Sequence, residues 1–547
     1  MTNPIKFGTD GWRAIIAEDF TFGNVRALAA SIARYLKQTG MAERGLIVGY
    51  DTRFGSDRFA EAIAEVVTAA DVPVQLAERF APTPAVSYSI VSRGAGGAAV
   101  VTSSHNPASW NGVKYKPEYA GSASPEVVAE LEAPLDEILA AGPPARRTLD
   151  EAAARGLLTR FDPRAPYLKR LGELVDLSRI RAAGLRIAVD PMWGAGQGYF
   201  SELLGGGATT VSELHAQHNP LFPGIGAPEP IARNLGETMA HMRAAREGAG
   251  GRGYDVGIAV DGDADRLGVL DENGAFVDQL QTFALLAYYL LDVRGERGAI
   301  VRALTTTRMV DRLGERFNVP VYETAVGFKY VGPKMLETDA LLGGEESGGY
   351  AVRGHIPERD GVLAGLCFLD LVARTGKTPT QLVRHLYDLV GEHHYDRIDV
   401  HLEEQQKPAI IQSVSHARPK EIGGYAVTGT SNLDGYLFNL AGGGWLLIPL
   451  LRHGAAHADL QETPTVSARV PDVLEAGAAA GGDRLNRTAA TARGQRRQGD
   501  GNSVTGKSTL EGNDHRCRGR GTATVDIYGW KLNAARRSCE PTCDGWR

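Results

Sequence analysis

Val256-Gly257-Ile258-Ala259-Val260-Asp261-Gly262-Asp263-Ala264-Asp265-Arg266 is the stretch that decides how this chain folds. Its first five residues form a short apolar run, which predicts a buried strand. Three carboxylates then follow on every second residue of a loop, where they can converge on one hard cation whose charge offsets their mutual repulsion. A solvated acidic turn is the alternative interpretation. We expect a buried strand that ends in a metal-binding loop.

An EF-hand is a competing explanation of the same loop, because Glu272 falls at its twelfth position. An EF-hand loop requires glycine at the sixth position, which Arg266 occupies here. The flanking segments also resemble strands, whereas an EF-hand is flanked by helices. We therefore exclude the EF-hand.

Apolar runs and amphipathic segments alternate along most of the chain. Helices are predicted at 24–38 and 56–70, and strands at 46–50, 72–76, 98–102, 185–189, 256–260, 299–304 and 340–343. This alternation indicates repeated α/β units. After Tyr395 the pattern is richer in strands, among them 436–440 and 445–448, which predicts a small α+β domain. We place the domains at 1–150, 151–290, 291–392 and 393–448, followed by a tail at 449–547.

The composition is that of an ordinary globular protein. A chain of 547 residues predicts three or four domains, and its 43% hydrophobic and 23% charged residues are ordinary globular usage. Its longest apolar run, 283–291, is much shorter than the roughly 20 residues that span a bilayer. The N-terminus lacks the features of a secretory signal, so we expect a cytoplasmic protein. The net charge of −6 gives no general reason to expect nucleic-acid binding.

Two further loops carry chemistry. Thr102-Ser103-Ser104-His105-Asn106-Pro107 follows a predicted strand, and ligands of open α/β sheets bind at the carboxyl ends of strands. An ordinary polar turn is the alternative, and the G-x-S-x-G elbow of many serine hydrolases is missing. Gly343-Gly344-Glu345-Glu346-Ser347-Gly348-Gly349 follows another strand. Its glycines allow close backbone approach, and Glu345 and Ser347 can bond sugar hydroxyls.

Together with Phe7-Gly8-Thr9-Asp10-Gly11-Trp12-Arg13, these three loops occur in an order and spacing that resembles the α-D-phosphohexomutase family, and its phosphoglucomutase/phosphomannomutase branch in particular. The resemblance implies four domains around a central cleft. Three of them are related α/β domains with mixed sheets, and the fourth is a smaller α+β domain.

The resemblance also implies roles for individual residues. Ser104 matches the serine that carries a phosphoryl group in the family. Together with Asp261, Asp263 and Asp265, it also matches the residues that bind Mg²⁺. The catalytic group implied in this way comprises Ser104, Lys114, Arg13 and His105, with Lys114 as general acid/base. The substrate-binding group comprises Glu345, Ser347, Lys329, Gly327 and Arg266.

The implied reaction converts hexose 1-phosphate to hexose 6-phosphate through a phosphoserine and a hexose 1,6-bisphosphate, with glucose 1,6-bisphosphate as activator. Glu345-Glu346-Ser347-Gly348-Gly349 is closer to glucose-preferring members than to the Glu-Met-Ser-Gly-His form of dual-specificity members. Phosphomannomutase, phosphoglucosamine mutase, a Mg²⁺-dependent phosphatase and an impaired sugar-phosphate-binding relative are the alternatives. We expect small-molecule hexose phosphates as partners, no nucleic acid or membrane, and a monomer or homodimer.

One departure from the family pattern concerns the fourth domain. Family members carry a phosphate-binding loop, Arg-x-Ser-Gly-Thr-Glu-Pro, after a strand that resembles 445–448. Here the chain reads Pro449-Leu450-Leu451-Arg452-His453-Gly454-Ala455. The tail is also unusual, because three of the four cysteines (Cys517, Cys539 and Cys543) lie near its end and its Lys and Arg outnumber its Asp and Glu.

We predict that residues from about 449 onward are translated out of frame and that the tail is largely disordered. Codons permitted for 449–461 can be chosen so that dropping the first nucleotide encodes Arg-Phe-Ser-Gly-Thr-Glu-Pro-Leu-Thr-Leu-Ile-Tyr, which contains the missing loop. The fourth domain is then expected to lack its last strand and helix. Resequencing the gene around codon 449 checks this, and an unaltered reading frame with the same tail in close relatives would contradict it.

Overall fold

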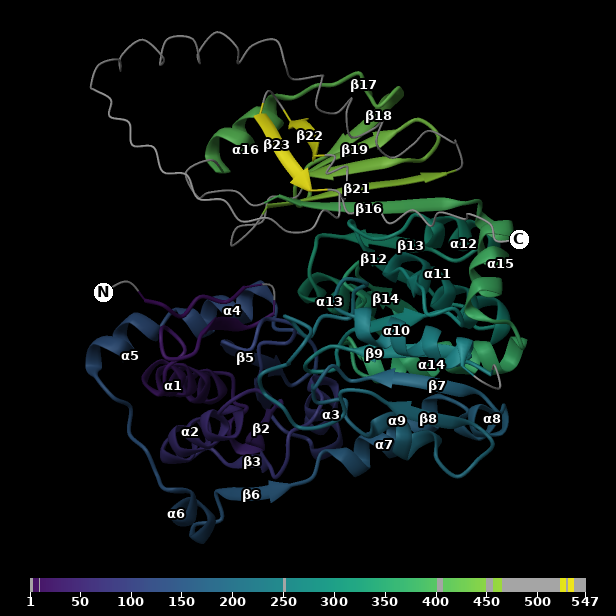
Figure 1. The fold of residues 1–547 in the computed structure, drawn as a ribbon. Helices are drawn as coiled ribbons and strands as arrows, with labels where there is room; N and C mark the ends of the chain where they lie inside the picture. Colours follow the sequence, from purple (N-terminus) through teal and green to yellow (C-terminus); the bar gives the residue numbers. More distant parts are fainter. Residues whose placement is uncertain are drawn as a thin grey trace, which may run out of the picture. The chain divides into compact units, whose positions relative to one another are not determined.

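The computed structural model describes residues 3–8, 10–248, 252–400, 407–448, 456–464, 522–527 and 530–535. The chain divides into two compact units, Met1–Glu392 and His393–Arg547. The first unit contains three mixed sheets, and the second contains an antiparallel sheet (Figure 1). This is the predicted class: three related α/β domains followed by a smaller domain.

The first sheet has the order β1-β5-β4-β2-β3-β6. Helices cover both of its faces. Leu46 and Val48 pack in one hydrophobic cluster with the first two helices, whereas Gly49 on the opposite face lies against Val86 of α3. This follows from the alternation of side chains along a strand. The elements are β1 Trp12–Ile15, α1 Phe22–Gln38, β2 Leu46–Tyr50, α2 Ser56–Ala69, β3 Val74–Ala77, α3 Thr83–Arg93, β4 Gly97–Val101, β5 Trp110–Pro117, α4 Pro125–Glu132, α5 Leu135–Ala141, α6 Leu149–Ala154 and β6 Leu158–Phe161.

The second sheet has the order β11-β10-β9-β7-β8, and the third has the order β13-β12-β14-β15. The elements of the second domain are α7 Arg164–Leu174, α8 Leu177–Ala182, β7 Arg186–Asp190, α9 Tyr199–Leu204, β8 Thr210–Glu213, α10 Gly236–Glu247, β9 Val256–Val260, β10 Leu267–Leu270 and β11 Phe276–Val277. Those of the third are α11 Gln279–Tyr288, β12 Ile300–Ala303, α12 Met309–Phe317, β13 Val321–Thr324, α13 Phe328–Thr338, β14 Leu342–Gly344, β15 Tyr350–Val352, α14 Gly361–Thr375 and α15 Pro379–Val390.

The three sheets share one local arrangement. In each of them a strand that pairs in parallel with one neighbour runs into a loop and returns as an antiparallel strand, as in β4 to β5, β9 to β10 and β14 to β15. The loops after β4, β9 and β14 are those singled out in the sequence. They therefore occupy equivalent places in three related sheets.

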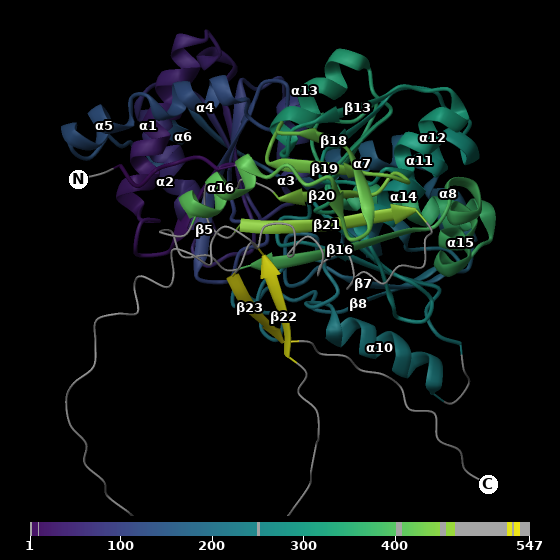
Figure 2. The ribbon, with the colours of Figure 1, turned by 90° about the horizontal axis from the view of Figure 1, so that it is seen from above.

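Helix α14 joins the second and third domains. Its residues from Gly361 to Val372 are all buried, as expected of a helix that is apolar all round. Gly365 faces Phe200 of α9 and Ile258 of β9, and α14 also contacts α11 and β15. Figure 2 shows α14 among the helices of these two domains when seen from above.

Two elements pack across the predicted domain boundaries. Strand β6 lies beyond residue 150 but pairs in parallel with β3 of the first sheet. Helix α11 begins at Gln279, before the predicted boundary at 290, and packs against α12 and α15 of the third domain. Composition cannot reveal either assignment, because each depends on which distant segment the element packs against. The predicted strands at 46–50, 256–260, 436–440 and 445–448 are confirmed.

The fourth domain is a six-stranded antiparallel sheet of order β16-β21-β20-β19-β18-β17. The expectation that this domain lacks its last strand is wrong, because β21 continues the sheet beyond 448 and pairs with both β16 and β20. Backbone hydrogen bonds form such pairs and do not require particular side chains. The elements are β16 His393–Val400, α16 Lys407–His416, β17 Glu421–Ile422, β18 Tyr425–Ser431, β19 Tyr436–Leu440, β20 Trp445–Ile448 and β21 Ala456–Pro464.

The prediction of a disordered tail falls mostly outside the described residues. Within the described part of the tail, β22 Thr522–Ile527 and β23 Trp530–Ala535 form an antiparallel pair. Residues 449–455, where the family's phosphate loop would lie, are not among those described.

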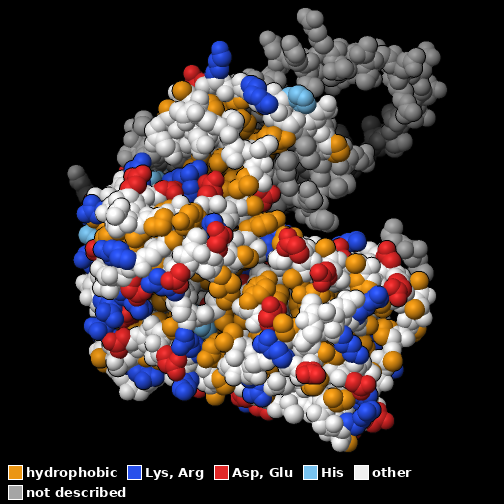
Figure 3. All heavy atoms as spheres, turned by 180° about the vertical axis from the view of Figure 1, so that it is seen from behind, with side chains coloured by type: hydrophobic (Ala, Val, Ile, Leu, Met, Phe, Trp, Pro, Cys, Tyr) orange, Lys and Arg blue, Asp and Glu red, His pale blue; other side chains and the backbone are white. Residues whose placement is uncertain are grey.

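Over the described part of the chain, no helix is both long enough and apolar enough to cross a bilayer. Figure 3 shows one face of the molecule, on which side chains of both charges are interspersed with apolar ones. This distribution agrees with the small net charge of −6.

We predict that Gly365→Ala lowers the melting temperature. An added Cβ would lie 2.8 Å from Phe200 Cζ, and such overpacking costs about 1–3 kcal/mol. Gly236→Ala is the matched control: this helical glycine is exposed and an added Cβ meets nothing within 4 Å, so the change is expected to be neutral or stabilising by about 0.5 kcal/mol. Thermal unfolding measures both variants, and equal melting temperatures would contradict the prediction.

Candidate active site

Ser104 stands at the centre of the candidate site. It follows β4, is 1% exposed and has a left-handed φ of 50°. Its Oγ donates a hydrogen bond of 2.7 Å to Asp261 Oδ2, and its backbone N–H donates to Thr102 Oγ1 at 2.9 Å. The loop after β4 thus presents a buried hydroxyl to the loop after β9, as the sequence predicted for strand-end loops.

Gly262 allows these two loops to approach each other. A Cβ added at this position would lie 2.4 Å from the backbone oxygen of Ser104. No other residue type fits at that distance without moving one of the loops. The glycine between Asp261 and Asp263 is therefore required by packing.

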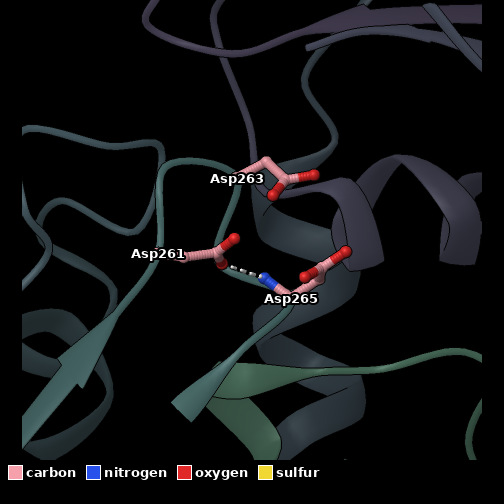
Figure 4. Close-up of side chains that lie close together, drawn as sticks. All are labelled: Asp261, Asp263 and Asp265. Atoms are coloured by element: carbon pink, nitrogen blue, oxygen red, sulfur yellow. Dashed lines mark hydrogen bonds between the residues drawn. The ribbon is translucent and has the colours of Figure 1, made fainter. Parts of the chain in front are cut away.

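The three aspartates of the loop after β9 are brought together as predicted (Figure 4). Asp261, Asp263 and Asp265 are fully buried, and one carboxylate oxygen of each lies within 4.8 Å of the others. Asp261 Oδ1 accepts hydrogen bonds from the N–H groups of Asp265 and Arg266 at 2.9 and 3.1 Å. Burial and the two neighbouring carboxylates raise the pKa of Asp261 well above its usual value.

The donor set of this cluster suits a hard divalent cation. Asp263 Oδ1 and Asp265 Oδ1 are buried and have no hydrogen-bond partner. Buried polar atoms without partners are rare in proteins, and carboxylate oxygens are the ligands that Mg²⁺ and Ca²⁺ prefer. These residues therefore fit a metal ion.

Lys114 of β5 neutralises part of this negative charge. Its Nζ lies 2.8 Å from Asp10 Oδ2, Asp263 Oδ2 and Asp265 Oδ2. Burial lowers the pKa of Lys114, but the three carboxylates outweigh burial and raise it above the usual value. In this arrangement the ammonium is a charge partner of the three carboxylates.

Arg359 links Asp10 of the N-terminal segment to the loops after β9 and β14, and the sequence analysis missed it. Its guanidinium donates to Asp10 Oδ2 at 2.5 Å, to Asp265 Oδ2 at 2.9 Å and to Glu345 Oε2 at 3.2 Å. Asp10 was quoted only as part of a motif. Two sequence features could have identified these residues: the charged run Glu358-Arg359-Asp360 directly before an apolar helix, and the single acidic residue within 7–13.

A second buried pair adjoins this network. Lys116 Nζ lies 2.9 Å from Asp10 Oδ1 and is also paired with Glu358. Asp10 therefore faces three cations, and although burial raises its pKa, they hold it well below the usual value. The first and third domains thus meet through charge pairs that are shielded from water.

Glu345 and Ser347 lie in the loop between β14 and β15. Burial raises the pKa of Glu345 to about 7, against the opposing effect of Arg359. Ser347 Oγ is buried without a hydrogen-bond partner. Gly348 has φ of 86°, and an added Cβ would lie 2.6 Å from the backbone oxygen of Leu267, so this loop also needs its glycine.

Arg13, His105 and Arg266 lie beside the Ser104 loop and the aspartates, and no described contact of their side chains with an aspartate is as short as those of Lys114 and Arg359. Arg13 Nη1 donates to Asn106 Oδ1 at 2.8 Å in the Ser104 loop. His105 Nδ1 is 3.3 Å from Ser104 Oγ, and burial together with nearby cations lowers the pKa of His105 well below its usual value. Arg266 pairs with Glu229 at 3.3 Å.

Gly327 and Lys329 lie at the start of α13. The ring of Phe328 between them lies 5.5 Å from Arg359 Cζ. Lys329 Nζ stands 5.3 Å from the centre of the Tyr330 ring. Among the described contacts, no hydrogen bond or ion pair joins these two residues to Ser104 or the aspartates.

The arrangement is suited to phosphoryl transfer. A buried hydroxyl faces carboxylates that fit a metal ion, and Lys114, Arg359 and Arg13 supply positive charge around it. Phosphoryl transfer depends mainly on positioning and on neutralising the charge of the transferring group.

Comparisons with known proteins agree with this chemistry. Family profiles for phosphoglucomutase/phosphomannomutase α/β/α domains I, II and III match residues 4–141, 165–274 and 278–390. The chain is 30% identical over 443 residues to a phosphoglucomutase/phosphomannomutase of Thermococcus kodakarensis, covering 81% of this chain and 91% of that one. It is 32% identical to a phosphoglucosamine mutase of Ruegeria sp. over 69% of this chain and 81% of that one.

A solved structure of a candidate phosphomannomutase from Thermus thermophilus superposes with a TM-score of 0.74 at 32% identity, covering 87% of this chain and 98% of that one. All of these relatives are named as sugar-phosphate mutases, but they are named for different sugars. They therefore agree on the type of enzyme and not on the sugar. The profiles, the relatives and the three converging loops lead to one conclusion: the chain belongs to the α-D-phosphohexomutase family of sugar-phosphate mutases.

Proposed function

We propose that this protein interconverts hexose 1-phosphate and hexose 6-phosphate, with glucose as the preferred sugar, through a phosphoserine at Ser104 and a hexose 1,6-bisphosphate intermediate. The observation that carries the proposal is the 2.7 Å hydrogen bond from Ser104 Oγ to Asp261, inside a buried cluster of carboxylates and cations. A hydroxyl placed there can accept and return a phosphoryl group.

Mg²⁺ is the proposed metal, held by Asp261, Asp263, Asp265 and the phosphorylated Ser104. When bound, it supplies positive charge that neutralises the transferring group. Binding there would give the unpartnered oxygens of Asp263 and Asp265 a ligand. Its charge would also weaken the attraction of these carboxylates for the Lys114 proton.

The protein's own groups then handle the protons. Lys114 is the proposed general acid/base for the sugar hydroxyl, because it is the ammonium closest to the aspartates. His105 is uncharged near neutral pH because its pKa is lowered, so its imidazole can accept the Ser104 proton when the serine receives the phosphoryl group. Arg13, held against Asn106, contributes charge beside the same loop.

The sugar is proposed to bind the loop after β14. Ser347 Oγ needs a partner, and Glu345 is an acceptor held by Arg359. Gly327, Lys329 and Arg266 are proposed to face the phosphate or the ring. Both phosphorylated ends of the bisphosphate must reach Ser104 in turn, so it has to reorient between the two transfers.

A second function has one observation in its favour. The Arg-x-Ser-Gly-Thr-Glu-Pro sequence is missing after β20, and in this family it anchors the phosphate that does not react. A chain without that anchor would bind sugar phosphates and turn them over slowly.

Ser104→Ala is expected to abolish mutase turnover, because it removes the hydroxyl that takes the phosphoryl group. Ser103→Ala is the matched control, since Ser103 Oγ is buried without a partner and its loss is expected to be nearly neutral. The assay follows hexose 1-phosphate with a trace of hexose 1,6-bisphosphate. A Ser104→Ala variant with near wild-type turnover would disprove the role of Ser104, and release of inorganic phosphate without isomerisation would indicate a phosphatase.

We expect a higher kcat/KM for glucose 1-phosphate than for mannose 1-phosphate. The two sugars differ at one hydroxyl, so the ratio is expected to be modest, about 10-fold to 100-fold. Steady-state kinetics with both sugars and with glucosamine 1-phosphate measure it. An equal or reversed ratio would contradict the glucose preference and leave the mutase assignment in place.

Glu345 is expected to make stability depend on pH. Its folded-state pKa of about 7 lies above the unfolded value of about 4.3. Its neutral form therefore contributes stability that is complete below about pH 4 and is lost as the pH rises through about 7. The glutamine in Glu345→Gln does not titrate. We therefore expect the melting temperature of this variant, relative to that of wild type, to rise by about 5 °C as the pH is raised from about 5 to 8.

The control for this experiment is Glu315→Gln, at an exposed glutamate on α12. Its melting temperature is expected to follow that of the wild type over the whole range. A constant difference between Glu345→Gln and wild type would show that Glu345 does not titrate there.

A further inference from the structure

The turn Asp51-Thr52-Arg53 lies directly beside the Ser104 loop. Strands β2 and β4 are parallel neighbours, so their carboxyl ends meet at the same edge of the sheet. The Arg53 side chain is fully shielded from solvent. Among the described residues, its hydrogen bonds go to backbone carbonyls, and its one ion pair is to Asp51.

The Arg53 guanidinium is bound to four backbone carbonyls of one loop. Nη2 donates to the oxygens of Ser104 and Asn106, both at 2.6 Å. Nη1 donates to the oxygens of Pro107 and Trp110 at 2.8 and 3.1 Å. Hydrogen bonds from a charged donor are shorter and stronger than neutral ones. The whole loop from Ser104 to Trp110 is therefore gathered around one planar cation.

The same turn also holds the N–H of Ser104. Asp51 Oδ2 accepts from Thr102 Oγ1 at 2.6 Å, and Thr102 Oγ1 accepts from the Ser104 N–H at 2.9 Å. Arg53 holds the Ser104 carbonyl. Both backbone groups of Ser104 are thus bound, which is how a non-glycine residue is kept at a φ of 50°.

Two further contacts hold Arg53 itself in place. Its Nε lies 3.3 Å from Asp51 Oδ2, and its Cζ lies 4.9 Å from the centre of the Phe222 ring in the second domain. The close packing of Gly262 against the Ser104 carbonyl bounds the loop from another side.

We propose that Arg53 is a positioning residue for the phosphoryl-carrying serine: by binding four carbonyls of the 104–110 loop it keeps Ser104 Oγ aimed at Asp261. The inference rests on the proposed function of Ser104. Lysine cannot substitute for this arginine, because a single ammonium lacks the planar fork that reaches several acceptors at once.

The first test is Arg53→Lys in the mutase assay. A displacement of about 1 Å at the nucleophile predicts a kcat about 100-fold lower. KM for hexose 1-phosphate should change less than about 3-fold, because no contact to substrate is lost. Arg44→Lys is the matched control, since Arg44 is an exposed arginine that donates to a loop carbonyl, that of Gly94. An unchanged kcat, or a loss confined to KM, would overturn the proposal.

A second pair of variants covers the case in which Arg53→Lys does not fold. Thr102→Val removes the acceptor of the Ser104 N–H and is expected to lower kcat by about 10-fold to 100-fold. Thr102→Ser keeps the hydroxyl and is expected to recover most of that loss. Equal kcat in the two variants would overturn the proposed control of Ser104 geometry by this turn.

Two measurements separate this inference from the proposed function. Intact mass after incubation with hexose 1,6-bisphosphate reports whether wild-type Ser104 takes up a phosphoryl group; if it does not, the proposed function fails. Hydrogen exchange at the Ser104 and Asn106 amides tests the positioning without any turnover. We expect at least about 10-fold faster exchange in Arg53→Lys than in Arg44→Lys, and equal exchange would overturn the proposal in either case.

Discussion

Burial of like charges is the constraint on which the first unit depends. Asp10, Asp263 and Asp265 are almost fully buried, and leaving a charge buried without a partner costs several kcal/mol. Lys114 and Arg359 supply the compensating charges. The aspartates of the cluster come from the first and second domains, Lys114 from the first and Arg359 from the third. Charge balance is therefore reached only when all three domains are folded together.

Repetition of one sheet arrangement explains how these groups come to meet. In each of the three domains, the chemistry lies in the loop that joins a central strand to its antiparallel neighbour. Ser104, Asp261 and Glu345 occupy these equivalent loops, and Arg359, directly before α14, bonds two of them. Helix α14 in turn packs on the second domain as well as the third. The fold thus repeats one strand-loop-strand arrangement three times and places in its loops a buried hydroxyl, a cluster of carboxylates that fits a metal ion, and the loop proposed to bind the sugar.

Local patterns made much of this predictable. Strands such as 46–50 and 256–260 are apolar runs bounded by turn residues, and Ser104 and the aspartates follow such runs directly. The remainder depends on pairs that are distant in sequence. Arg359 and Asp10 are separated by 349 positions, and nothing near Arg53 in the sequence shows that its acceptors are carbonyls of residues 104–110. Strand β6 and helix α11 pack across the predicted boundaries for the same reason, since sheet pairing and helix packing are non-local.

Strand β21 has a consequence for how the second unit behaves in solution. Within the described residues, β16 joins the sheet only through β21. If β21 detaches, β16 and β20 each present a row of unpaired backbone N–H and C=O groups. Such edges are templates for strands of other molecules. Any change that weakens the segment 456–464 therefore favours self-association through newly opened sheet edges, independently of its effect on catalysis.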